Sequence, residues 1–268
     1  MQAVEKTIRE KLTEFVETDH RNAMPAHNGM RIYDSPLIGF AAADDSMFET
    51  LTAPEIFGTQ LIRPGEWLSG AKTVISFFLP FTQEVRASNR VKGLPSEEWV
   101  SARIDGEAFI RVIQTYLVEC FKTLDAGAVA PSLDSRFSTQ VPRPGEVKIS
   151  NWSERHTAHI AGLGTFGLHR ALITEKGSAG RFGSVVTTLA ISPTERKYSG
   201  PFDYCPYLTK GKCGACISRC PAEAIVDGKK DNLRCSAYVD MTKEMFKPRY
   251  GCAKCNIAVP CETGIPKI

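Results

Sequence analysis

The fold of this chain is signalled by the stretch CPYLTKGKCGACISRCPAEAIV, residues 205–226, which holds four cysteines. Cys213, Cys216 and Cys220 with Pro221 form C-x2-C-x3-C-P, which is the last part of the bacterial ferredoxin run C-x2-C-x2-C-x3-C-P. Cys205 takes the place of the first cysteine, although seven residues rather than two separate it from Cys213. This pattern predicts the cradle of an iron-sulfur cluster.

The chain continues with Cys235, the pair Cys252 and Cys255, and Cys261, so that eight cysteines are available for two sets of four. In two-cluster ferredoxins the fourth cysteine of the run binds the other cluster, because the chain crosses between the clusters. We therefore expect two 4Fe-4S clusters with crossed ligands. One is held by Cys205, Cys213, Cys216 and Cys261, and the other by Cys220, Cys235, Cys252 and Cys255.

Three other interpretations of these cysteines remain open. A pair of four-cysteine zinc sites also uses paired C-x2-C units, but the C-x3-C-P step and the AEAIV tail fit a ferredoxin better. Disulfides are disfavoured in a reducing compartment. A purely structural role is the third, because a bound cluster supplies folding energy as zinc does.

The distribution of cysteines also divides the chain, since eight of the nine follow residue 204. We expect an α/β domain over residues 1–200 and a cluster module over residues 201–268. The 268 residues are 43% hydrophobic with a net charge of +3, and no stretch approaches eighteen uncharged apolar residues. These features predict a cytoplasmic protein without a membrane or nucleic-acid partner.

Local patterns place several elements in the first part of the chain. Apolar spacing predicts helices over residues 4–19, from Ser96 to Leu124, and over 155–164. Short β-rich runs predict strands at 72–81, 128–131, 170–174 and 182–192. The segment 141–148, with two prolines and a glycine, is expected to be a loop.

Residues 151–189, NWSERHTAHIAGLGTFGLHRALITEKGSAGRFGSVVTTL, followed by the eight cysteines, resemble the epoxyqueuosine reductase family, with reductive dehalogenases as more distant relatives. The family segment has the form LERPLAERAGLGWIGK. The residues that match it are Glu154, Arg155, Ala158, Ala161, Gly162, Leu163, Gly164 and Gly167. Cys235-Ser236-Ala237-Tyr238 stands where the family has a cysteine followed by Ser-Tyr.

This resemblance implies an α+β protein, with a nitroreductase-like α/β core followed by a bacterial ferredoxin-like two-cluster module. It implies an iron-sulfur oxidoreductase that passes electrons through the clusters to a base-off cobalamin and reduces a small substrate. The residues that would contact the corrinoid are Arg155, Gly164, Thr165, Gly167, Arg170, Arg181, Ser184, Thr187 and Thr188. A helix C-cap explains Gly162 or Gly164 equally well. His156, His159 and His169 lie outside any Asp-x-His-x-x-Gly corrinoid motif and are expected to be structural.

The chain departs from the family pattern at several places. The family's proton donor is an Asp six residues before the Glu of LERPLA, where this chain has Lys148, and an insertion would instead align Asp134 with it as the catalytic acid. The chain ends seven residues after Cys261, without the family's C-terminal RNA-binding extension. We therefore expect a small-molecule substrate or a redox partner protein rather than nucleic acid.

Two further alternatives concern the first domain. The protein could be a ferredoxin-like electron-transfer protein that serves a partner and has no chemistry of its own. A nitroreductase-like core could also hold FMN in place of the corrinoid.

Overall fold

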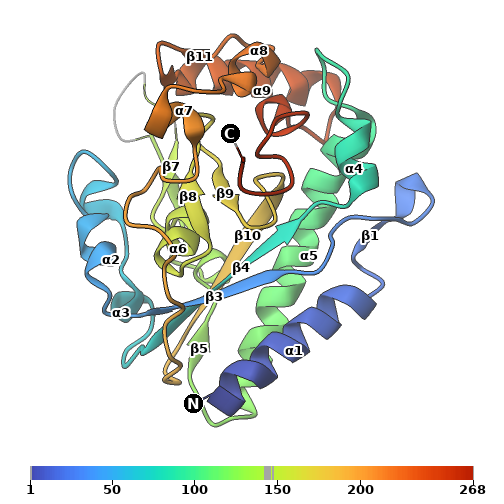
Figure 1. Ribbon diagram of the computed structural model, residues 1–268. Helices are drawn as coiled ribbons and strands as arrows, with labels where there is room; N and C mark the ends of the chain where they lie inside the picture. Colours follow the sequence, from blue (N-terminus) through green and yellow to red (C-terminus); the bar gives the residue numbers. More distant parts are fainter. Residues whose placement is uncertain (1, 142–145, 147, 268) are drawn as a thin grey trace.

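The computed structural model of the protein describes residues 2–141, 146 and 148–267 (Figure 1). Its centre is a four-stranded antiparallel sheet in the order β3-β4-β10-β5. The strands are β3 (Leu37–Ala42), β4 (Thr73–Pro80), β5 (Ala128–Val129) and β10 (Gly180–Thr187). All eight residues of β4 are buried, as expected for a central strand covered on both faces.

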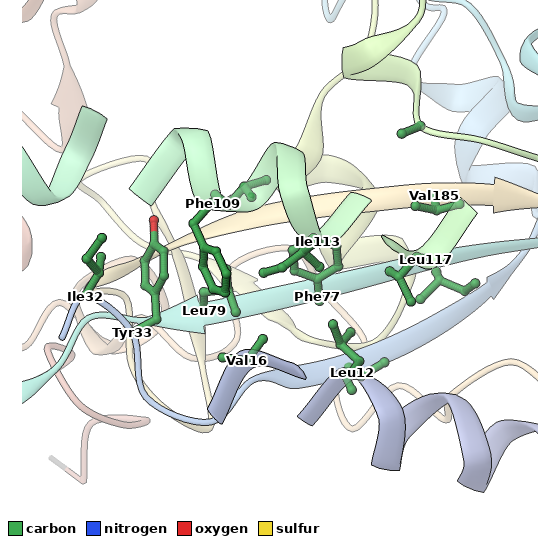
Figure 2. Close-up of a cluster of buried hydrophobic side chains, with 14 of the residues drawn as sticks. Leu12, Val16, Ile32, Tyr33, Phe77, Leu79, Phe109, Ile113, Leu117 and Val185 are labelled. Atoms are coloured by element: carbon green, nitrogen blue, oxygen red, sulfur yellow. The ribbon is translucent and has the colours of Figure 1, made fainter. Parts of the chain in front are cut away.

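One face of the sheet is covered by two helices, α1 (Gln2–Thr18) and α5 (Glu97–Lys122). Figure 2 shows Leu12 and Val16 of α1 and Phe109, Ile113 and Leu117 of α5 meeting the side chains of β4 and β10. The Ser96 hydroxyl begins α5 by accepting a hydrogen bond from the Trp99 N–H at 3.1 Å. This face forms the largest apolar core of the molecule.

The opposite face is covered by shorter elements that border the site described below. These are α2 (Ser46–Thr50), α3 (Pro64–Trp67), α6 (Glu154–Ile160) and the hairpin of β8 (Gly164–Phe166) and β9 (Leu172–Thr174). Trp67 and Trp152 meet edge to face within this layer. A separate apolar cluster joins Phe78 of β4 to the helix α6 and the hairpin.

The cysteine-rich module lies across one end of the sheet, at the top of Figure 1. It contains α7 (Pro206–Lys210), α8 (Ala215–Arg219), β11 (Ile225–Val226), β12 (Lys229–Lys230), α9 (Asn232–Met245) and a short 3-10 helix η4 (Lys254–Asn256). The module is tied to the α/β part by buried polar contacts. The Lys254 ammonium donates to the carbonyls of Asn89 at 3.0 Å and Val91 at 2.6 Å, and Glu262 forms an ion pair with Arg90 at 2.8 Å.

The remaining elements are short and connect these layers. They are β1 (Ala23–Met24), η1 (Pro25–His27), β2 (Met30–Arg31), η2 (Gly58–Gln60), α4 (Gln83–Ser88), η3 (Pro131–Leu133), β6 (Thr139–Gln140) and β7 (Ile149–Ser150).

Most of the sequence-based elements are confirmed, with shifted ends. The predicted helix over 155–164 is wrong in its last part, because α6 ends at Ile160 and Gly162 adopts a positive φ of 81°. The chain then enters β8 instead of continuing as helix. Strand β3 and helix α9 were not predicted, since β3 is rich in Gly and Ala and α9 lacks a clear apolar stripe. Most of the predicted loop over 141–148 lies outside the described residues.

Candidate metal centre and the adjoining recess

Four cysteines from three segments of the module line one small cavity of about 20 Å³. They are Cys205, Cys213, Cys216 and Cys261, named here the first cysteine set. Cys205 stands at the start of α7 and Cys216 within α8, while Cys261 comes from the end of the chain. The β8–β9 hairpin forms part of the same wall through Leu168, His169 and Ile173.

The other four cysteines, Cys220, Cys235, Cys252 and Cys255, are named the second cysteine set. Their thiols lie within electrostatic range of one another, because Cys220 and Cys235 both raise the pKa of Cys252 and of Cys255. The two sets are also close to each other, since Cys255 of η4 raises the pKa of Cys216 of α8. All nine cysteines are among the described residues, and none forms a disulfide.

The thiols are held in an environment that disfavours uncompensated thiolates. Burial raises the pKa of Cys216 to about 12, and the neighbouring thiols Cys255 and Cys261 add to the rise. Burial likewise raises the pKa of Cys255 to about 12 and that of Cys261 to about 11. A cationic partner would be needed to hold these sulfurs as thiolates, which is how iron and zinc bind cysteine.

Four arginines gather where the module meets the sheet, and we call this region the arginine recess: Arg103, Arg155, Arg170 and Arg181. Arg155 is exposed to solvent, yet desolvation by the surrounding protein lowers its pKa, and the charges of Arg181 and Arg170 lower it further. Arg103 and Arg181 line a cavity of about 210 Å³ together with Cys252.

A buried carboxyl group lies close to this recess. Burial raises the pKa of Glu154 to about 7 and the Glu107 charge adds to the rise, whereas the nearby donors Ser184 and Trp152 and the Arg181 charge oppose it. Neither Glu154 oxygen has a well-formed hydrogen bond to any residue that the structure describes. The nearby donors Trp152 and Ser184 are paired with each other, since the Trp152 indole N–H donates to the Ser184 hydroxyl at 2.9 Å. Sequence reasoning used Glu154 only as a family match, and its single signal was a carboxylate in an otherwise apolar and basic segment.

Asp134, the predicted catalytic acid, lies in a different environment. Its carboxylate is paired with the Arg136 guanidinium by two hydrogen bonds, of 2.9 and 2.8 Å. These bonds lower the pKa of Asp134 to about 2. The structure therefore holds Asp134 as an ionised carboxylate, whereas a proton donor must keep its proton near neutral pH. Lys148 is exposed.

The predicted corrinoid contacts divide into two groups. Arg155 and Arg170 are exposed and belong, with the half-buried Arg181, to the arginine recess. Gly164, Thr165, Gly167, Ser184 and Thr187 are buried, and Thr188 is half-buried. The Thr165 hydroxyl accepts from the Tyr204 N–H at 2.9 Å, and the Thr187 hydroxyl donates to the Gly127 carbonyl at 2.8 Å. These five residues are accounted for by contacts within the protein.

The glycines of this segment also have a packing explanation. A Cβ atom on Gly164 would lie 2.0 Å from the Ile173 carbonyl oxygen, so the two strands of the hairpin require a glycine at this position. A Cβ atom on Gly167 would lie 2.8 Å from the His169 ring. The AGLG motif thus positions the hairpin against the first cysteine set.

The described residues contain neither a single-ion metal site nor a membrane-spanning helix. Across residues 2–141, 146 and 148–267, no three His, Cys, Asp or Glu side chains converge as they would around a single metal ion. No helix within these ranges has both the length and the apolar character needed to cross a membrane.

The fold and the site define an α/β protein that carries two sets of four cysteines in a module at one end of its sheet. No protein-family model matches the chain. Epoxyqueuosine reductase from Bacillus cereus is 30% identical over 254 residues, which cover 85% of this chain and 61% of that protein. The same enzyme from Vibrio cholerae is 27% identical over 221 residues, covering 76% of this chain and 53% of its own length. The chain belongs to an epoxyqueuosine reductase-like family, and it spans little more than half the length of these relatives.

Solved structures show the same fold. An epoxyqueuosine reductase with an epoxyqueuosine-modified tRNA-Tyr stem loop has a TM-score of 0.55 at 18% identity, covering 98% of this chain and 67% of that chain. Epoxyqueuosine reductase from Streptococcus thermophilus has a TM-score of 0.50 at 20% identity, with coverages of 98% and 67%.

These relatives correct one prediction from the sequence. The expectation of a small molecule or redox protein as partner, with no role for nucleic acid, is wrong, because the solved relative with the stem loop binds tRNA. The small net charge of +3 averaged over the chain concealed the local gathering of arginines.

Proposed function

We propose that this protein is an iron-sulfur reductase of the epoxyqueuosine reductase type, which passes electrons through two 4Fe-4S clusters to a bound corrinoid and reduces a modified nucleoside in RNA. The observation that carries the proposal is the gathering of Cys261 with Cys205, Cys213 and Cys216 around one cavity. Three of these four side chains are buried and have no disulfide, which suits thiolate ligands enclosed with a metal cluster.

The proposed organisation follows the sequence. Residues 1–200 would form a nitroreductase-like core and residues 201–268 a ferredoxin-like module. Crossed ligation is supported by the position of Cys220, which follows the first-set residue Cys216 along α8 but lies near Cys252 and Cys255. The closeness of Cys216 to Cys255 favours electron transfer between the clusters.

The residues present fit the clusters fully and the corrinoid in part. Of the predicted corrinoid contacts, Arg155 and Arg170 are the two that are exposed in the recess, and they would hold polar groups at its edge. When bound, a corrinoid would supply a strongly reducing metal centre for an electrophilic carbon.

An RNA substrate agrees with the charge of the recess. Arginine guanidinium groups bind phosphate through paired N–H donors. Glu107 is paired with Arg181 and its charge also acts on Arg103, so one carboxylate faces four arginines and the group carries net positive charge. A phosphate of a folded RNA strand is a suitable counterion for it.

Removal of an epoxide oxygen as water needs two electrons and two protons for each product. Glu154, rather than Asp134, is our candidate for the group that holds a proton beside the recess. Its oxygens have no hydrogen-bond partner among the described residues, and its pKa of about 7 keeps a proton available near neutral pH. Asp134 is ionised and paired with Arg136.

The test begins with anaerobic cluster reconstitution and titration with cobalamin, followed by iron and cobalt analysis. The loaded protein and a strong reductant are then incubated with a tRNA stem loop carrying epoxyqueuosine, and the RNA is analysed by mass spectrometry. We expect about eight iron atoms per chain, bound cobalt, and a product that has lost one oxygen atom.

Variants separate the roles of the two carboxyl groups. Glu154→Gln should lower the rate of product formation at least tenfold with the iron content unchanged, whereas Asp134→Asn should leave the rate within twofold. Eight irons without cobalt or product would replace the proposal with that of an electron carrier. Absence of iron would refute it.

A further inference from the structure

A buried histidine lies against one of the cysteines of the first set. His169, only 2% exposed, follows β8 in the hairpin, and its Nε2 atom lies 3.2 Å from the Cys261 Sγ atom. The Lys230 ammonium of β12 donates to the His169 carbonyl at 3.1 Å. The imidazole therefore connects the glycine-rich hairpin of the α/β part to the cysteine-rich module.

The hydrogen bonds of the ring determine where its proton lies. The Ala171 N–H donates to His169 Nδ1 at 3.0 Å, and a backbone amide can only donate. Nδ1 is therefore an acceptor, and the ring proton is on Nε2, which faces Cys261. The interaction is an N–H donor directed at the sulfur.

The surroundings fix this geometry. The ring packs on Gly167, where any Cβ atom would lie 2.8 Å from it, so the ring occupies the space that a side chain would fill. On the other side of Cys261, the Ser178 hydroxyl and N–H both donate to the Cys261 carbonyl, at 3.0 and 2.9 Å. Donor and acceptor are each held by separate contacts, so the bond does not depend on exposed, rotatable groups.

We propose that His169 is a positioning residue that donates a hydrogen bond from Nε2 to the Cys261 sulfur and thereby raises the reduction potential of the cluster held by the first cysteine set. The inference rests on the proposed function, because it requires a cluster at this set. A donor to a ligating sulfur stabilises the added negative charge of the reduced cluster more than that of the oxidised one. His169 directly precedes Arg170 of the arginine recess in the chain, so the hydrogen bond lies between this recess and the first cysteine set.

The experiment compares wild-type protein with His169→Leu, which removes the donor, and His169→Gln, which returns an N–H donor near the Nε2 position. Each protein is reconstituted anaerobically, its iron is measured, and its clusters are titrated with reductant under EPR. His159→Leu is the matched control, because His159 is also buried but bonds to the Gly164 carbonyl at 2.7 Å.

We expect His169→Leu to shift the midpoint potential of one cluster to more negative values and to leave the other unchanged. His169→Gln should restore most of the shift, and His159→Leu should leave both potentials as in wild type. Unchanged potentials in a fully loaded His169→Leu protein would overturn the inference.

A second measurement uses the wild-type protein and covers the case in which His169→Leu loses iron. Reduced protein labelled with ¹⁵N-histidine is examined by pulsed EPR in H₂O and in D₂O. The hydrogen bond predicts a histidine nitrogen coupling to one cluster, accompanied by an exchangeable proton. A loaded cluster without this coupling contradicts the inference alone, whereas wild-type protein without clusters contradicts the proposed function.

Discussion

The two cysteine sets differ in what surrounds them. Three members of the first set, Cys205, Cys216 and Cys261, are enclosed by packed protein, whereas Cys213 is exposed. The β8–β9 hairpin lines the same cavity through side chains that include the hydrogen-bonded His169. The second set is half-buried, and Cys252 lines the cavity of about 210 Å³ that also contains Arg103 and Arg181.

This difference suggests different roles for the surroundings of the two cysteine sets. A packed, hydrogen-bonded wall fixes the properties of whatever the first set binds. A cavity lined by two arginines beside the second set can accept an anionic ligand from solution. The following predictions test this contrast, from the largest expected effect to the smallest.

Loss of one thiol from each set has the largest expected effect. Cys216→Ser and Cys252→Ser should each lower the iron content from about eight to about four atoms per chain, because each set would bind one four-iron cluster under the proposed function. Iron analysis and EPR of reconstituted protein provide the measurement. Cys120→Ser, on α5, is the control and should keep all the iron. Loss of all iron from either variant would mean that the sets assemble as one unit.

The unpaired carboxyl near the recess should make stability depend on pH. Burial raises the pKa of Glu154 from 4.5 to about 7, so between these values the folded protein keeps a proton that the unfolded chain has lost. The free energy of unfolding should therefore fall as pH rises through this window, by about 3 kcal/mol from this residue.

Denaturant unfolding at pH 4.5 and pH 8 measures the effect. Glu154→Gln should be more stable than wild type at pH 8 and should lack this part of the pH dependence. Equal pH dependence in the two proteins would show that Glu154 is solvated or paired in solution.

On the packed side, the ion pair next to Cys261 should contribute to stability. Glu262 is 4% exposed and pairs with Arg90 at 2.8 Å and Arg86 at 3.4 Å. Glu262→Ala leaves Arg86 buried without this partner and should lower the free energy of unfolding by about 2–3 kcal/mol.

Glu175→Ala removes an exposed pair with Lys197 of 2.8 Å and should cost less than about 1 kcal/mol. Similar losses in the two variants would argue that the Glu262 pairs are screened by solvent and do not anchor the first set.

The smallest effect is expected from the glycine of the hairpin. Gly164→Ala places a methyl group against the Ile173 carbonyl and should lower the free energy of unfolding by about 1–3 kcal/mol. Gly65→Ala in α3, where a Cβ meets nothing within 4 Å, should be neutral or slightly stabilising. If Gly164→Ala reduced cobalamin uptake without any loss of stability, the glycine would serve the cofactor rather than the packing.

Secondary-structure elements that depend on neighbouring residues were predicted correctly. The apolar run of β4 and the Ser96 cap of α5 can be recognised in the sequence, because an apolar pattern and a helix cap each depend on residues only a few positions apart. The partition of the cysteines also came from local spacing and stays a prediction; the first set lines one cavity, and the thiols of the second set lie within electrostatic range of one another. The AGLG motif was predicted as a cofactor contact, which stays a prediction, and the fold adds a packing role for Gly164 beside β9.

The sequence by itself determined which residues are candidate metal ligands, because thiol chemistry and the C-x2-C and C-x3-C-P spacings are local properties. Only the tertiary structure decided which groups act together. It brought Arg103 of α5 into electrostatic range of Arg181, which also acts on Arg155, left the Glu154 oxygens without a well-formed hydrogen bond among the described residues, and oriented Arg136 toward Asp134. The reason is physical: burial and neighbouring charges set the pKa of a carboxyl group, and these depend on segments that meet only in the folded chain.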